Sequence, residues 1–580
     1  MSQSKGLLPY FLGFCFVVYP LQFAWQGLDF CDEGNALAIY QQIFTHPESV
    51  ADTLGTWGTS VIGGLWLAVF GHLGVLGTRV GGILVSLLTM IFVYLLYRDH
   101  IERKRLLWGL AGSFLFCYHF GNLLGFHYYG MSILFYAMSL FFLAEGLKKN
   151  SGALLGVAGF LISFNVFVRL PNALGLLFVL ALPYNAYLKK AGKAALPLQS
   201  CWFFSGMLLN LMAVASALAL LGHLPHYIQA LRFLMESATR SGGIYKQEVL
   251  LGRILHDYFH LFRKTLLVTA LLVLFVFLLG AAQKKSPRLA TAGAGCLLAP
   301  IALSGFWGRP LFSTAMNFLF GACILTLGLR GLKPGPDKDL GLISLLVFAL
   351  FLIMPFGTAT YYPAYLIYVL MVALPLFFHF IHETSALEAG VTLHWGGRTR
   401  RAGFMLDEVA FAKAKRISFL VFVVFGFTNN VSYIHNEFHS RTQMTARINH
   451  PLLRGIRVNQ EVAEPLNQLI EQLPRYVRPG DPMLVAWAAP ILYYISGTYP
   501  YVPYPWTEAY LEGRLRAFLL EGPARGPLPV VIRERWNSGG KHPYDEILEA
   551  FFEKYGYTKK WENRCHEIYT PSPGRWTQGS

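Results

Sequence analysis

Charged residues are scarce in this chain of 580 residues: they make up 14% of it, whereas 54% of the residues are hydrophobic and 15% aromatic. Uncharged apolar runs recur along the sequence, as at 266–280 and 340–355. This composition excludes a single soluble domain and an intrinsically disordered chain. It predicts a polytopic α-helical membrane protein.

Cysteine is also rare, with seven residues in the chain, most of them inside apolar runs and without the spacing of metal ligands. This pattern excludes a disulfide framework and a cysteine-based zinc site. Cys31 and Cys565 are too isolated to predict a disulfide. We expect the cysteines to act as small core hydrophobes.

Lysine and arginine are absent from residues 28–60, 121–126 and 357–362. The net charge of +16 comes largely from basic residues in other short connections, such as 98–105 and 148–149. Because basic loops stay on the cytoplasmic side, the segments without them are predicted to face outward. The basic charge therefore predicts contact with membrane lipids and not with nucleic acid.

The alternation of apolar and basic segments predicts about thirteen membrane spans, with the amino terminus inside and the carboxyl terminus outside. The first span lacks a clear signal-peptide cleavage site and is predicted to be retained. We place the spans at 7–27, 77–97, 106–120, 128–147, 152–168, 173–188, 197–221, 265–282, 289–306, 311–329, 340–356, 363–382 and 416–434.

Two domains are predicted. Residues 1–434 form the membrane domain, with a first outer loop at 28–76 and a long outer loop at 222–264. Residues 435–580 are predicted to form a small α/β domain on the outer face, since short apolar strands alternate there with amphipathic helices. The strands are expected at 483–487 and 529–532, and the helices at 462–473, 508–520 and 544–555.

Acidic residues begin the first outer loop, at Asp29, Asp32 and Glu33. The apolar residues of 36–44 then recur at helical spacing, which predicts a helix lying in the membrane interface. Asp32 could simply cap this helix while Glu33 complements its dipole. Asp32 could also take a proton from an incoming hydroxyl group, and the two roles are compatible.

Basic residues of the outer side could hold a phosphate group. Arg79 begins the second span, and Arg169 lies between two apolar helices, where a charge is costly unless it lines a polar cavity. Alternatively, Arg169 snorkels to the lipid head groups. The long outer loop adds further basic residues that could equally contact lipid: Arg232, Arg240, Lys246, Arg253, His256, Arg263 and Lys264.

Several motifs together resemble the GT-C superfamily of membrane glycosyltransferases, in particular the aminoarabinose transferase and protein mannosyltransferase group. They are the Asp32-Glu33 pair before a helix, Phe70-Gly71 and residues 78–84 entering the second span, and Tyr97-Arg98 leaving it. The resemblance covers roughly residues 7–190. Further along it consists of the span count, the long outer loop and the outer α/β domain, where the segments 490–494 and 529–531 are similar.

The resemblance implies an inverting transfer of a sugar from a polyprenyl-phosphate donor to an acceptor hydroxyl group. The sequence has no further outer acidic cluster suited to a divalent metal, so a metal-independent mechanism is expected. Asp32 would be the base, and Glu33 its partner or an acceptor-orienting group. Asp29 and Trp57 would belong to the substrate loop, although the segment 55–60 lacks the proline-rich sequence of many relatives. The donor phosphate would be bound by outer basic residues: Arg79, Arg169, Arg240, Lys246, Arg253 and His256.

Two other functions were weighed against this one. A transporter or flippase of lipid-linked sugars would use Asp32 and Arg169 as charges along a central pathway, but the informative charges cluster at the outer rim. A non-catalytic receptor needs far fewer spans. The acceptor stays open between a glycolipid, a glycan and a protein, and the expected location is the bacterial inner membrane, with the C-terminal domain on the periplasmic side.

Overall fold

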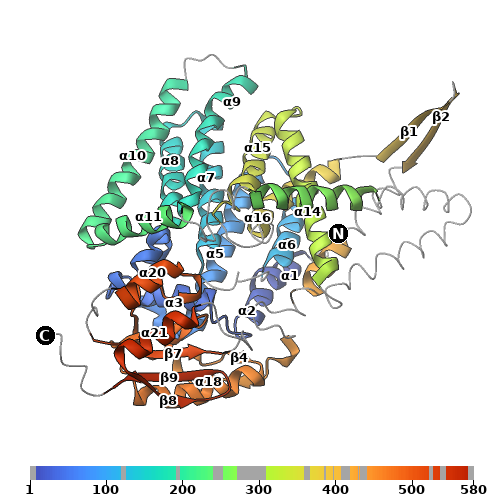
Figure 1. Ribbon diagram of the computed structural model, residues 1–580. Helices are drawn as coiled ribbons and strands as arrows, with labels where there is room; N and C mark the ends of the chain where they lie inside the picture. Colours follow the sequence, from blue (N-terminus) through green and yellow to red (C-terminus); the bar gives the residue numbers. More distant parts are fainter. Residues whose placement is uncertain are drawn as a thin grey trace, which may run out of the picture.

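The computed structural model is mostly helical, with a small sheet-containing domain at one end of the helices (Figure 1). It describes residues 8–118, 126–190, 196–239, 252–270, 309–357, 366–383, 387–395, 398–406, 419–428, 430, 441–521, 527–535 and 544–572.

The helices coincide with the predicted spans wherever these fall on described residues. The first span is α1 (Leu8–Gly13), η1 (Phe14–Val18) and α2 (Tyr19–Phe23). The others are α5 (Gly74–Tyr97), α6 (Arg103–Cys117), α7 (Tyr128–Lys149), α8 (Gly152–Val168), η4 (Leu170–Leu180) with α9 (Ala181–Leu188), α10 (Leu196–Leu220), α14 (Arg309–Leu332), α15 (Lys338–Ile353) and α16 (Leu366–Glu383). Residues 252–270 and 419–428 are also helical. The span predicted at 289–306 lies outside the described residues, so the count of thirteen stays a prediction.

Five described helical segments are long and apolar enough to cross a membrane: Pro47–Tyr97, Tyr128–Lys149, Leu170–Leu188, Leu196–Leu220 and Leu366–Glu383. The 25 residues of α10 extend about 37 Å at 1.5 Å per residue, more than the ~30 Å hydrocarbon core of a bilayer. Large apolar side chains of α10, such as Trp202 and Leu208, are exposed on its surface, as expected for a helix in contact with lipid. The predicted fold class, a polytopic helical membrane protein, is confirmed.

The first outer loop contains more helix than predicted. Helix α3 (Asp32–Gln42) forms where expected, but it is followed by η2 (Pro47–Thr56) and by the unpredicted apolar helix α4 (Trp57–Phe70). Helix α3 packs against α4 and against α19 (Ile491–Ser496) of the C-terminal domain, and its predicted position in the membrane interface stays a prediction. An unpredicted hairpin of β1 (Leu387–Trp395) and β2 (Arg398–Leu406) follows α16 and extends away from the helices (Figure 1).

The C-terminal domain is built on a five-stranded sheet with the order β6-β5-β7-β9-β8. The strands β5 (Pro482–Ala486), β6 (Tyr499–Pro500) and β7 (Val530–Glu534) are parallel, while β8 (Tyr557–Glu562) and β9 (His566–Pro571) are antiparallel to their neighbours. Both predicted strands are therefore confirmed as β5 and β7.

Three helical segments were predicted in this domain, and two form as expected. Helix α18 (Gln460–Gln472) starts where the Asn459 side chain accepts the backbone N–H of Glu461, a standard amino-terminal cap. Helix α21 (Asp545–Tyr555) also matches. The helix predicted at 508–520 is instead three short pieces, η11 (Thr507–Ala509), α20 (Glu512–Arg516) and η12 (Ala517–Glu521).

The C-terminal domain is fixed to the first outer loop by backbone contacts. The N–H of Gly27 donates to the carbonyl of Arg457 at 2.8 Å, and the N–H of Arg457 donates to Trp25 at 2.8 Å. Gly74 has φ of +61° and lies so close to the domain that a Cβ atom would be 2.0 Å from the Leu452 carbonyl oxygen. Only glycine fits such a position without strain. The C-terminal domain therefore packs directly against the first outer loop.

Candidate functional site

Helix α3 begins at Asp32, and the preceding loop caps it. The Asp29 carboxylate accepts the backbone N–H groups of Cys31 at 3.0 Å and of Asp32 at 3.1 Å. Asp29 therefore has the capping role that the sequence suggested for Asp32. Its side chain is 9% exposed and supports the start of α3, and its place in a substrate loop stays a prediction. Asp32, the first residue of α3, is half-buried.

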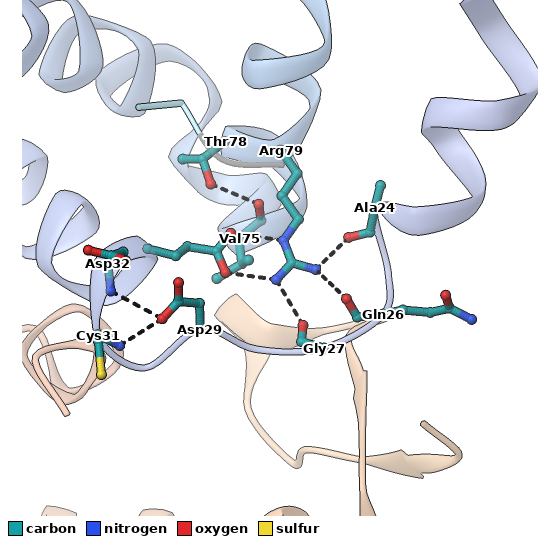
Figure 2. A network of polar contacts seen from close by, with 10 residues as sticks. Ala24, Gln26, Gly27, Asp29, Cys31, Asp32, Val75, Thr78 and Arg79 are labelled. Atoms are coloured by element: carbon teal, nitrogen blue, oxygen red, sulfur yellow. Dashed lines mark hydrogen bonds and ion pairs between the residues drawn. The ribbon is translucent and has the colours of Figure 1, made fainter. Parts of the chain in front are cut away.

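Glu33 and Arg79 form a buried ion pair between α3 and α5. Arg79 donates from Nε and Nη2 to the two carboxylate oxygens of Glu33, at 2.8 and 2.7 Å. Its remaining N–H groups reach the carbonyls of Ala24 at 2.8 Å, Gln26 at 3.3 Å and Gly27 at 2.8 Å (Figure 2).

The predicted phosphate-binding role of Arg79 is therefore wrong. A guanidinium has five N–H donors, and all five of Arg79 are occupied by Glu33 and the three carbonyls. The side chain is 2% exposed. Arg79 instead binds the chain between the first span and α3 to the second span. Glu33 is neutralised by this pairing, so its carboxylate has a structural role.

A small hollow lies beside Glu33. It lies between α3, the start of α5 and the residues before α7, and is lined by Glu33, Ala36, Leu37, Tyr40, Thr78, Phe126 and His127. Asp32 comes one residue before the lining residue Glu33, at the start of α3.

His127 connects this hollow to Arg169. The His127 and Tyr129 rings stack with centroids 5.4 Å apart, and the Arg169 guanidinium lies 4.8 Å from the centroid of the Tyr129 ring. Burial and the Arg169 charge lower the pKa of His127 to about 3, so the imidazole is neutral at physiological pH. The sequence interpretation missed His127, although a titratable residue directly after the outward segment 121–126 was a usable signal.

Arg169 is buried at the junction of α8 and η4, with 3% of its surface exposed. The alternative that it snorkels to lipid head groups is therefore wrong. It donates from Nη1 to the Met354 carbonyl at 2.9 Å and from Nη2 to Phe356. No carboxylate of the described residues pairs with it, and three of its five N–H groups have no partner there. Among the basic residues predicted to bind phosphate, Arg169 retains donors for an anion.

The remaining residues that were predicted to contact the substrate or the donor phosphate lie elsewhere in the chain. Trp57 is 3% exposed and donates its indole N–H to His223 at 3.1 Å, and its substrate contact stays a prediction. Arg253 and His256 lie exposed on the helix 252–270, where the His256 ring packs on His260. Arg240 and Lys246 lie outside the described residues. The phosphate-binding roles of these four basic residues stay predictions.

Hydrogen bonds link the start of α3 to a buried acid of the C-terminal domain, Glu534. The Cys31 thiol donates to the carbonyl of Ala488 at 3.0 Å, and the N–H of Ala488 donates to the Glu534 carboxylate at 3.0 Å. Burial raises the pKa of Glu534 to about 7, and the nearby Glu508 adds to this rise. Glu534 therefore holds a proton at a pH where most carboxyl groups are ionised.

The raised pKa of Glu534 predicts that the stability of the folded protein depends on pH. As pH rises from the ordinary glutamate pKa of 4.5 to about 7, the unfolded chain loses the proton of Glu534 while the folded protein retains it. Stability therefore falls over this window, by roughly 3 kcal/mol at 1.4 kcal/mol per pKa unit. Glu534→Gln keeps an acceptor for Ala488 without a titrating proton. We expect it to unfold at a higher temperature than the wild type at pH 8, and at a similar temperature near pH 4.5.

Thermal unfolding followed by tryptophan fluorescence between pH 4.5 and 9 measures this difference. Glu549→Gln is the control, because Glu549 is exposed on α21, and it should follow the wild type at every pH. A Glu534→Gln variant less stable than the wild type at pH 8 would show that the carboxylate is ionised and held by its neighbours.

No protein-family model and no curated protein matches the sequence. Among solved structures, the chain is similar to the crystal structure of ArnT from Cupriavidus metallidurans bound to undecaprenyl phosphate. The sequence identity is 12% and the TM-score 0.42, over 98% of this chain and 99% of that chain.

Proposed function

We propose that this protein is an inverting membrane glycosyltransferase that moves a sugar from a polyprenyl-phosphate donor to an acceptor hydroxyl group. One observation carries the proposal. Asp32 begins the rigid helix α3 next to Glu33, which lines the hollow and is neutralised by the buried Arg79. The proposal therefore assigns the base to Asp32 and a structural role to Glu33.

The proposed reaction is one displacement. The Asp32 carboxylate takes the proton of the acceptor hydroxyl, and the hydroxyl oxygen forms a bond to the anomeric carbon. The bond between that carbon and the phosphate oxygen breaks, and polyprenyl phosphate leaves with the bonding electrons. A single displacement inverts the anomeric carbon. Arg169 supplies positive charge for the leaving phosphate, a contribution that is often the largest in such sites, and no step is assigned to a metal ion.

Location and substrates belong to the same proposal. The absence of lysine and arginine from residues 28–60 supports placing the first outer loop and the C-terminal domain on the periplasmic face of a bacterial inner membrane. The donor would then be a sugar on an undecaprenyl-type phosphate in the outer leaflet. The acceptor would be a glycolipid, a glycan or a protein on that face.

Arg169 provides a prediction about the donor. Arg169→Ala removes the buried charge, and we expect it to raise the KM for the donor by 10-fold or more, since a charged hydrogen bond contributes about 1.5–3 kcal/mol. Arg169→Lys keeps a positive charge without the planar fork and should recover part of the loss. The control is Arg263→Ala, on the exposed surface of the helix 252–270. An unchanged donor KM in Arg169→Ala would remove Arg169 from phosphate binding.

The wild-type protein tests the whole proposal. Cells lacking the protein should accumulate its own donor and acceptor, so their total lipid extract and envelope fraction serve as substrates. Purified protein in lipid vesicles is added, and mass spectrometry follows the lipid-linked sugars and the surface glycans. We expect one polyprenyl-phosphate sugar to be consumed, with release of polyprenyl phosphate and a mass gain in one acceptor. Movement of a lipid-linked sugar across the bilayer without its consumption would favour a flippase instead.

A further inference from the structure

The hairpin of β1 and β2 has one apolar face. Its strands pair along their whole length, and Gly396-Gly397 joins them in the sequence, a dipeptide common in tight hairpins. Successive residues of a strand lie on opposite faces of a sheet, while directly paired residues share a face. On one face, all odd-numbered positions from Leu387 to Trp395 are apolar, and so are their partners at 402, 404 and 406. The other face carries mainly polar residues and glycine.

Two arginines lie on the apolar face near the tip of the hairpin. Arg398 pairs with Trp395, and Arg400 pairs with Leu393, so both arginines share the face of the apolar residues. The two strands together carry three arginines and one acid, Glu388, which lies on the other face. The apolar face is therefore basic at its tip and carries no acid.

The hairpin stands apart from the rest of the described structure. Among the described elements, β1 and β2 make extensive contacts only with each other. Figure 1 shows the hairpin extending away from the helices, at the end of the molecule opposite to the C-terminal domain. A two-stranded hairpin is at best marginally stable in water by itself. Its apolar face therefore calls for a partner surface.

The surface of the bilayer is within reach of that face. Helix α16, one of the segments long and apolar enough to cross a membrane, ends at Glu383. Strand β1 begins four positions later, at Leu387, and a fully extended chain covers about 14 Å over that distance. The base of the hairpin is thus held close to the membrane end of α16.

The residues at the tip favour a lipid surface over a second copy of the chain. Tryptophan is enriched at the level of the lipid head groups, and an arginine can lay its apolar stem on lipid while its guanidinium binds phosphate. Two copies packed face to face would instead bury Arg398 and Arg400 on faces without an acid, which is costly. Anionic lipid supplies both the apolar layer and the negative charge that this face lacks.

We propose that the β1–β2 hairpin lies on the membrane surface, with its apolar face in the bilayer interface and with Arg398 and Arg400 on the phosphate groups of anionic lipids. Apolar burial and attraction to anionic lipids both contribute to such binding. In the proposed orientation this surface is the cytoplasmic one, where anionic lipids are concentrated. The inference goes beyond sugar transfer and does not depend on it.

Photo-crosslinking at two neighbouring positions tests the contact. The full-length protein, with p-benzoylphenylalanine replacing either Leu393 on the apolar face or Thr392 on the polar face, is placed in vesicles of equal parts phosphatidylcholine and phosphatidylglycerol. Gel filtration in detergent first checks that both variants fold like the wild type. After irradiation, mass spectrometry should find lipid adducts at position 393 in several-fold excess over position 392. Equal lipid yields at the two positions would overturn the inference, as would adducts of position 393 only with a second copy or with another part of the chain.

The arginines are tested with the crosslinker at position 393. Arg400→Gln should lower the lipid adducts in the anionic vesicles by up to about five-fold, the contribution of one basic residue at an anionic surface. Arg401→Gln is the matched control, since it removes the same charge from the opposite face, and it should lower them less. Lipid yields that are the same in pure phosphatidylcholine as in the anionic vesicles would overturn the binding of anionic lipids. A wild-type protein that transfers no sugar would overturn the proposed function and leave this inference standing.

Discussion

Asp32→Asn is expected to abolish sugar transfer while the protein still folds and enters the membrane. A positioned base contributes about 10²- to 10⁴-fold to a rate, and asparagine has the size of aspartate without its basicity. The Asp29 carboxylate accepts the backbone N–H of Asp32, so the substitution leaves this cap of α3 in place. Turnover of the polyprenyl-linked sugar, measured by mass spectrometry in vesicles, tests this expectation.

Two controls isolate the chemistry from the fold. Glu48→Gln changes another acid of the same outer loop, which lies on the surface beside His46, and should transfer at the wild-type rate. The thermal stabilisation of Asp32→Asn by undecaprenyl phosphate should equal that of the wild type, because the base acts on the acceptor. Turnover by Asp32→Asn within a few fold of the wild type would show that another group accepts the proton.

The membrane helices were predictable because the information is local. An apolar run of sufficient length has to become a helix in lipid, where every backbone group needs an internal partner, and basic residues mark its ends. Helix α4 was missed because residues 57–70 lie within the stretch that the charge pattern assigned to an outer loop. The strands β5 and β7 were also readable, since each is a short apolar run next to turn residues.

The site was less predictable because its geometry depends on pairs of residues far apart in the sequence. Arg79 and Arg169 look alike as single basic residues beside apolar spans. Arg79 meets Glu33, 46 positions earlier, whereas Arg169 donates to carbonyl groups of residues 354 and 356 and lies over the Tyr129 ring. No local pattern distinguishes these cases. The same holds for Asp29 and Asp32, whose roles in the cap are decided by the path of the loop between them.

The Glu33–Arg79 pair leads to the second large expected effect, on stability. Arg79→Ala leaves a buried carboxylate and three carbonyl groups without their donors. Removing one partner of a buried ion pair costs about 3–5 kcal/mol, a large part of the stability of a typical protein. We expect little folded protein in the membrane, and a markedly lower unfolding temperature for any that is recovered. Fluorescence-detected gel filtration in detergent measures both.

Arg79→Lys distinguishes this structural role from phosphate binding. A lysine keeps the positive charge but has three donors on one atom and cannot replace the planar fork. It should therefore fail to restore stability, because Glu33 and the carbonyls of residues 24, 26 and 27 are held from different sides of the guanidinium. Arg232→Ala, at an exposed position of α11 (Leu224–Thr239), should unfold like the wild type. If Arg79→Lys is as stable as the wild type and only its donor KM is raised, the guanidinium would be a phosphate ligand after all.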